Sequence, residues 1–251
     1  MEEAFWSVPC DENSLLVKID TNFQTCDFGF RDVVTMSGEV CFGSILKYRA
    51  SKEMADLYRQ KGFEKKADKL MEIANKISEL LPATFIDDRG FLRASTGLSS
   101  QADVWATAFA VYVGAVKEPY ESKACKALAK AYSEGLMANE GQIRHVLTSD
   151  NYSATSAWEK AAAPINRYQN GAYWGTPTGW VCYAIYQSDQ GLAKQLAEEY
   201  IAHLRITDFR INPSTHGGPY ECVFPADDYQ QNPVYMTSVS IPYAAFLRME
   251  R

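Results

Sequence analysis

The stretch from Tyr168 to Trp180, YQNGAYWGTPTGW, gathers the residue types that suit a sugar ligand. Aromatic faces stack on the apolar face of a pyranose ring, and amides match hydroxyls with paired donors and acceptors. Glycine lets the backbone come close to a ligand. The same residue types also build ordinary buried turns, so this stretch by itself leaves both interpretations open.

Overall composition narrows the class of ligand. The chain has 251 residues and a formal charge of -6, whereas nucleic acids and anionic membranes attract a basic surface. No apolar segment reaches the roughly 18 to 20 uncharged residues of a membrane span. The first residues, MEEAFW, lack the basic and apolar regions of a signal peptide. We therefore expect a cytoplasmic protein with a neutral small-molecule or oligosaccharide ligand, and no nucleic-acid or membrane partner.

Metal-binding patterns are missing from the sequence. The six cysteines and three histidines are scattered without C-x-x-C or zinc-type spacing. We expect no metal site and no cofactor.

Periodic apolar residues predict helices along most of the chain. Two of them, 101–116 and 178–187, are apolar nearly all round and are followed by amphipathic helices. The other predicted helices span residues 37–62, 70–81, 122–137, 192–204 and 234–247. This order predicts an all-α fold with inner and outer helices in one domain over residues 1–251. Four long loops, 22–39, 86–105, 141–180 and 206–233, are expected at one rim, where loops of this length are usually functional.

Four of these segments resemble the six-hairpin glycosidases with catalytic (α/α)6 barrels, namely processing α-glucosidases, trehalases and glycogen-debranching amylo-glucosidases. They are CDFGFRD at 26–32, QADVW at 101–105, YQNGAYW at 168–174 and GGPYEC at 217–222. The resemblance implies an (α/α) toroid of helical hairpins. About eight helices are predicted instead of twelve, so the expected toroid is incomplete or open, or the chain is the C-terminal two-thirds of a larger barrel.

The resemblance also implies a reaction. It places a general acid at Asp27, with Asp32 as the other candidate, and a general base at Glu221. In an inverting glycosidase such carboxyl groups stand about 6.5 to 9.5 Å apart, which leaves room for the attacking water. The implied substrate-binding residues are Arg31, Gln101, Asp103, Trp105, Tyr168, Gln169, Asn170, Tyr173 and Trp174.

Structural alternatives stand beside these roles. Asp27 also suits a turn beside Gly29, and Asp103 also suits the N-cap of the following helix. Arg31 either pairs with Asp32 to order the loop or donates to a sugar hydroxyl. Glu221 is a lone carboxylate in a loop rich in glycine and aromatic residues, and its alternative is a solvated charge.

Three functions are compatible with these features. The leading hypothesis is an inverting glycoside hydrolase acting on an α-linked glucoside or a related neutral oligosaccharide. A non-catalytic carbohydrate-binding remnant of such a barrel is the second. The third is a polysaccharide lyase on a helical toroid, which would need a basic cleft that the charge of -6 disfavours.

Overall fold

The computed structural model describes residues 2–19, 31–214 and 216–249. Its helices are α1 (Glu2–Ser7), α2 (Cys41–Gln60), α3 (Glu64–Phe85), α4 (Val104–Tyr112), α5 (Tyr120–Ser133), α6 (Thr178–Tyr186), α7 (Gln190–Ile206), the 3-10 helix η1 (Pro225–Asp227) and α8 (Thr237–Met249). Its strands are β1 (Lys18–Ile19), β2 (Val34–Thr35), β3 (Gly38–Glu39), β4 (Ala138–Asn139), β5 (Gln142–Arg144), β6 (Lys160–Ala161), β7 (Tyr173–Trp174), β8 (Cys222–Phe224) and β9 (Tyr229–Gln231).

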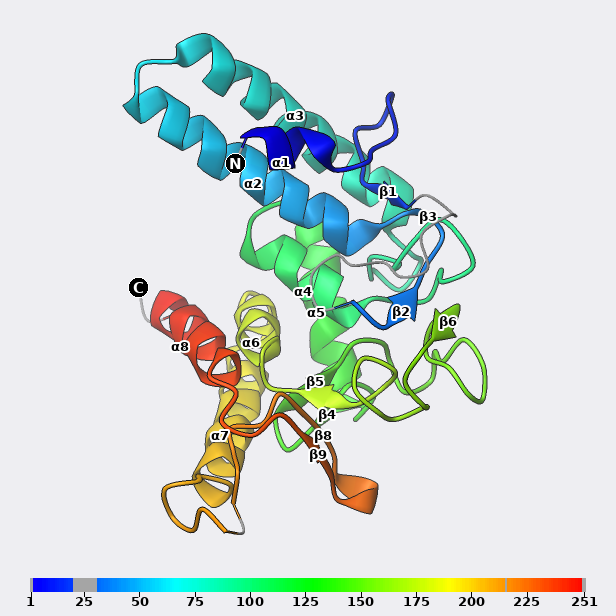
Figure 1. Cartoon of the computed structure of the whole chain (residues 1–251), viewed down its shortest axis with the longest axis vertical. Helices are drawn as coiled ribbons and strands as arrows, with labels where there is room; N and C mark the ends of the chain where they lie inside the picture. Colours follow the sequence, from blue (N-terminus) through cyan, green and yellow to red (C-terminus); the bar gives the residue numbers. More distant parts are fainter. Residues whose placement is uncertain (1, 20–30, 215, 250–251) are drawn as a thin grey trace.

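Helices α2 and α3 form a long antiparallel hairpin at one end of the molecule (Figure 1). Gly62, at φ 75°, lies in the turn between them, where a left-handed residue commonly ends a helix. The predicted apolar stripe of α3 is buried, including Leu70, Ile77 and Leu81. The sequence places Pro82 beyond the helix, yet α3 continues to Phe85. Phe85 is fully buried, so packing offsets the hydrogen bond that proline removes.

Helix α6 is the centre of the helical layer. It packs against α4, α5, α7 and α8, as Figure 1 shows. Every residue of α4 from Val104 to Val111 is buried, which agrees with the prediction of an apolar inner helix. The amphipathic partners α5 and α7 cover this layer and bury only one face each.

The expected all-α toroid is wrong, because the long loops contain strands. Five of these strands form an antiparallel sheet in the order β4-β5-β7-β8-β9. Two further two-stranded sheets pair β1 with β3 and β2 with β6. The fold is therefore mixed helix and strand. Each strand is two or three residues long, too short for an alternating pattern to be visible in the sequence.

A second, smaller core anchors the segment around residue 31. It includes Val34, Met36, Val146 and Trp158, all essentially fully buried. Pairing of β2 with β6 joins the same two regions through the backbone. This core holds the segment after residue 31 against the loop that precedes β7.

None of the helices in the described residues combines the length and apolarity needed to cross a membrane.

Two glycines give a matched test of the β4–β5 hairpin. Gly141 has φ 74° in the hairpin turn, and a Cβ atom there would overlap the backbone of Tyr200 in α7. Gly135 has φ 70°, but a Cβ atom there would meet nothing. We expect Gly135→Ala to lose about 1–2 kcal/mol of unfolding free energy from left-handed strain alone. Gly141→Ala should lose about 1–3 kcal/mol more through the added clash. Urea unfolding measures both, and equal losses would contradict the packing of the hairpin on α7.

Candidate active site

A buried ion pair joins the segment after residue 30 to the start of α4. Arg31 Nη1 lies 2.7 Å from Asp103 Oδ2, and Arg31 Nη2 donates to Asp103 Oδ1 at 2.9 Å. Both side chains are fully buried. The guanidinium also lies over the rings of Phe42 and Trp158, 5.2 and 4.6 Å from their centroids. Such a bidentate, stacked pair fixes both side chains and both segments.

This geometry decides two of the sequence alternatives. Arg31 pairs with Asp103, so the expected ion pair between Arg31 and Asp32 is wrong. Asp103 is the N-cap of α4, since its Oδ1 accepts the backbone N–H of Ala106 at 2.9 Å. Asp103 Oδ1 therefore accepts from both Arg31 and Ala106, while Oδ2 lies in ion-pair contact with the Arg31 guanidinium.

Gln169 holds Asp32 in place. Its Oε1 accepts the backbone N–H of Val33 at 3.0 Å, and its Nε2 donates to the Asp32 carboxylate. Arg31 is anchored in the interior, whereas Asp32 is exposed. The buried arginine thus presents the next residue, an aspartate, at the surface beside the Tyr168 loop.

Asn170 organises that loop through the backbone. Its Oδ1 accepts the N–H of Ala157 at 2.7 Å, and its Nδ2 donates to the carbonyls of Thr155 and Ala163 at 3.2 and 2.8 Å. The buried amide has the partners it needs within the protein. From the sequence, a sugar was expected to supply the hydrogen-bond partners of Asn170.

Glu221 precedes β8 and is only 5% exposed. Its Oε1 accepts from the Tyr168 hydroxyl at 3.5 Å, and its Oε2 accepts from Asn232 Nδ2. The Tyr235 phenol lies close enough that Glu221 contributes to raising its pKa. Glu221 is therefore a held, buried carboxylate, in contrast to the alternative of a solvated loop charge.

Asp32 and Glu221 act on the same two phenols. Burial raises the pKa of Tyr168, and the charges of Glu221 and Asp32 raise it further. The pKa of Tyr235 is also raised, mainly by burial, with contributions from Glu221 and Asp32. Two carboxylates from distant parts of the chain thus contact adjacent residues of one loop, Glu221 through Tyr168 and Asp32 through Gln169.

Backbone strain coincides with this cluster. Tyr168 has φ 46°, a conformation that side chains other than glycine rarely adopt. Its carbonyl accepts the N–H of Ala172 at 3.2 Å and Trp174 Nε1 at 3.3 Å. These hydrogen bonds hold the strained residue with its hydroxyl toward Glu221.

Buried aromatic rings lie beneath Tyr168. Its ring packs at 5.0 Å on Trp174, which meets Trp105 edge-on at 5.5 Å. Trp105 stacks on His145 at 3.5 Å. Trp105 and Trp174 are fully buried, so they support the site from below and leave no face for a ligand.

The remaining predicted site residues lie around these buried rings. Tyr173 is half-buried and stacks on Phe224 at 6.1 Å. Gln101 is half-buried and donates to the carbonyl of Ala157. Asp27 lies outside the described residues, so its role as general acid stays a prediction.

Sequence reasoning missed Tyr235 and Asn232 as partners of Glu221, and Arg144 as a buried support. Arg144 donates to the carbonyl of Gly171 at 2.9 Å and to Asn151 Oδ1 at 2.7 Å. In the sequence, the glycosylation sequon at residues 151–153 and the segment NPVY at 232–235 show no pattern that links them to the cluster. Among the described residues, no group of three or more His, Cys, Asp or Glu side chains is arranged to hold a metal ion.

Comparison with known proteins shows a similar fold in a solved structure but assigns the chain to no family. No model of a known protein family matches the chain, and no curated protein matches it. The expected membership in the six-hairpin (α/α)6 glycosidases is therefore unsupported, and the mixed fold speaks against it. A solved structure named a sialidase aligns with 88% of this chain at a TM-score of 0.61 and 10% identity. The chain spans about a fifth, 20%, of the length of that protein, and at this identity the likeness shows the fold alone.

The Arg31–Asp103 pair can be tested by stability. Arg31→Met or Asp103→Leu leaves the opposite charge buried without its partner, which costs about 3–5 kcal/mol of unfolding free energy. The double variant should recover much of that loss, because no charge then remains buried. Urea unfolding of the three variants measures this coupling. As a control, Glu53→Gln breaks an exposed pair with Arg49 on α2 and should change little. Additive losses in the double variant would contradict a direct pair.

Proposed function

We propose that this chain is a glycoside hydrolase in which Asp32 and Glu221 form the catalytic carboxyl pair. The observation that carries the proposal is that both side chains bond to adjacent residues of one loop, Glu221 to the Tyr168 hydroxyl and Asp32 to the Gln169 amide. Glycosidic cleavage needs one carboxylic acid to protonate the leaving oxygen and one carboxylate on the opposite face of the sugar. Two carboxyl groups in one cluster of phenols and amides supply these groups.

Their surroundings suggest which group does what. Glu221 is buried and held by Tyr168 and Asn232, so it is fixed well enough to orient a water as general base. Asp32 is exposed and held through Gln169, so it is the carboxyl that can reach a leaving oxygen. The proposed outcome is inversion at the anomeric carbon, with Asp27 as the alternative acid.

The charges favour a neutral sugar over an acidic one. Asp32 and Glu221 are both carboxyl groups, and the arginines that directly precede Asp32 and Tyr168 in the chain are already engaged. Arg31 pairs with Asp103, and Arg167 pairs with Asp227 at 2.7 Å. A sialoside or uronate would bring its own carboxylate to this cluster without a free cation to receive it. We therefore propose a neutral α-linked glucoside or a related oligosaccharide, in contrast to the substrate that the name sialidase gives for the structural neighbour.

The experiment is hydrolysis of a panel of aryl α- and β-glycosides, with aryl sialosides included. Glu221→Gln and Asp32→Asn should each lower kcat at least about a hundredfold, since positioned acid and base groups contribute factors of that size. Sugar binding, measured by calorimetry, should persist in both variants. Glu198→Gln, on the exposed face of α7, is the matched control and should keep full activity.

Three results would go against the proposal. Unchanged turnover in Glu221→Gln would show that Glu221 is not the general base. Wild-type protein that binds sugars and never cleaves them would favour the carbohydrate-binding remnant. Faster turnover of sialosides than of glucosides would contradict the neutral substrate. The anomer formed first, followed by proton NMR, tests inversion.

A further inference from the structure

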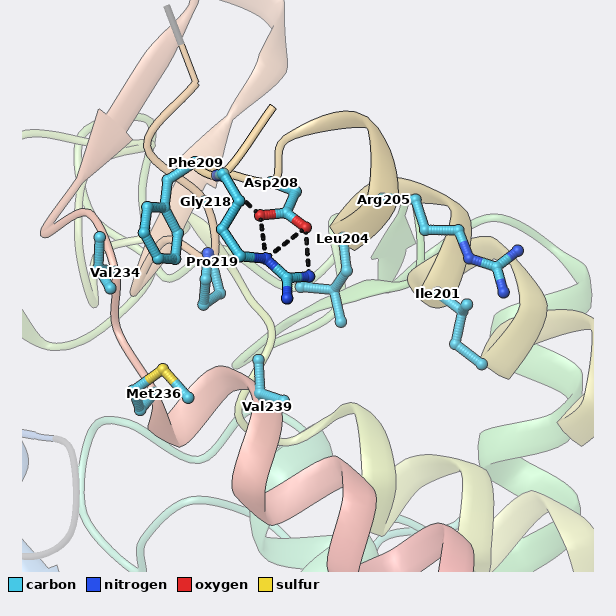
Figure 2. A pocket seen from close by; sticks show the side chains of 11 residues that line it. Ile201, Leu204, Arg205, Asp208, Phe209, Gly218, Pro219, Val234, Met236 and Val239 are labelled. Carbon is cyan, nitrogen blue, oxygen red and sulfur yellow. Dashed lines mark hydrogen bonds and ion pairs between the residues drawn. The ribbon is translucent and has the colours of Figure 1, made fainter. Parts of the chain in front are cut away.

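A cavity of about 500 Å³ lies between the end of α7 and the start of α8. Figure 2 shows its apolar side chains pointing into a common space from separate elements. Its walls include Leu204, Phe209, Pro219, Val234, Met236 and Val239. The volume lies within the range of about 300–1,000 Å³ that small-molecule sites usually have.

Apolar side chains in this cavity are unusually accessible to water. Met236 is 58% exposed, Val234 43% and Ile201 37%. They come from two separate parts of the chain, α7 and the segment just before α8, yet line one hollow. A contiguous exposed apolar surface of this kind marks a place where a ligand gains free energy by displacing water.

The charges at the rim select the ligand. Arg210 is paired with Asp208, its Nη2 lying 2.5 Å from Oδ2, and both residues line the cavity. Arg205 also lines the cavity and is exposed, and no carboxylate of residues 2–19, 31–214 or 216–249 pairs with it. The lining therefore carries one uncompensated positive charge, in a protein whose formal charge is -6.

The backbone around the cavity is held in a fixed and strained form. The N–H of Val234 donates to Gly217 O at 2.8 Å, and that of Tyr235 donates to Pro219 O at 2.7 Å. Val234 has φ 58°, a costly conformation for a β-branched residue. With this conformation Val234 and Met236 line the cavity, whereas Tyr235, between them, does not.

We propose that this cavity is a second binding site, separate from the carboxyl cluster, for a small amphipathic anion. The apolar body of the ligand packs against Pro219, Met236 and Val239, and its acidic group pairs with Arg205. Because Tyr235 is not among the lining residues, the cavity and the carboxyl cluster can be filled at the same time.

The test uses 8-anilinonaphthalene-1-sulfonate, a fluorescent aryl anion, with decanoate and decanol as competitors. The probe should bind saturably at one site. Decanoate should displace it about two- to fivefold better than decanol, the advantage expected of one exposed ion pair. Displacement by decanoate shows that alkyl acids fit, whereas probe binding without displacement would restrict the site to aryl acids.

Variants locate the site and separate its two parts. Met236→Glu should weaken the binding of probe and both competitors, because it puts a charge among the apolar walls. Arg205→Gln should remove the preference for decanoate over decanol. Leu247→Glu, at another exposed apolar position of α8, is the control and should bind like the wild type. Circular dichroism confirms that each variant is folded.

Several outcomes would overturn the proposal: probe binding that does not saturate, equal losses in Met236→Glu and Leu247→Glu, or a decanoate preference that survives Arg205→Gln. Because the readout is binding, these results do not depend on whether the protein cleaves glycosides.

Discussion

The fully buried ion pair between Arg31 and Asp103 is the constraint on which the candidate site depends. Each partner also has a second role, because Asp103 caps α4 and Arg31 fixes the residue that follows it. A lone charge in this interior would cost several kcal/mol, so the two segments must stay together. Because α4 is buried, its ion pair with Arg31 fixes the position of the next residue, Asp32. Gln169 then links Asp32 to the loop that carries Tyr168.

The loop that carries Tyr168 is held by contacts in the interior, and these contacts fix the position of Tyr168. Asn170 is consumed by backbone partners, and Trp174 and Trp105 are closed off beneath it. Only Tyr168, strained and half-buried, reaches from this platform toward Glu221. Most of the residues whose types suit a sugar therefore serve to hold this loop in place. The carboxyl groups and the phenols remain to contact a ligand.

Local periodicity was enough to predict helices α2 to α8, but not α1, η1 or the fold. The stripe of α3 and the apolar α4 and α6 are visible in the sequence because burial repeats every three to four residues. Strands β4 to β9 are too short to show a period, and their pairing links residues from 138 to 231, which no local window contains. The site divides in the same way. Glu221, Asp32 and Tyr168 could be proposed from residue type, whereas the Arg31–Asp103 pair and the contribution of Tyr235 are products of tertiary packing.

The most direct measurement of the central claim is the ionisation of Tyr168, followed by tyrosinate absorbance and assigned with Tyr168→Phe. Burial and the two carboxylates raise the pKa of this phenol, because negative neighbours disfavour the phenolate. Removing either charge must then lower the pKa toward its ordinary value. The account predicts that Asp32→Asn and Glu221→Gln each lower it. A pKa that falls in Glu221→Gln and stays unchanged in Asp32→Asn would show that the two acids do not share a site.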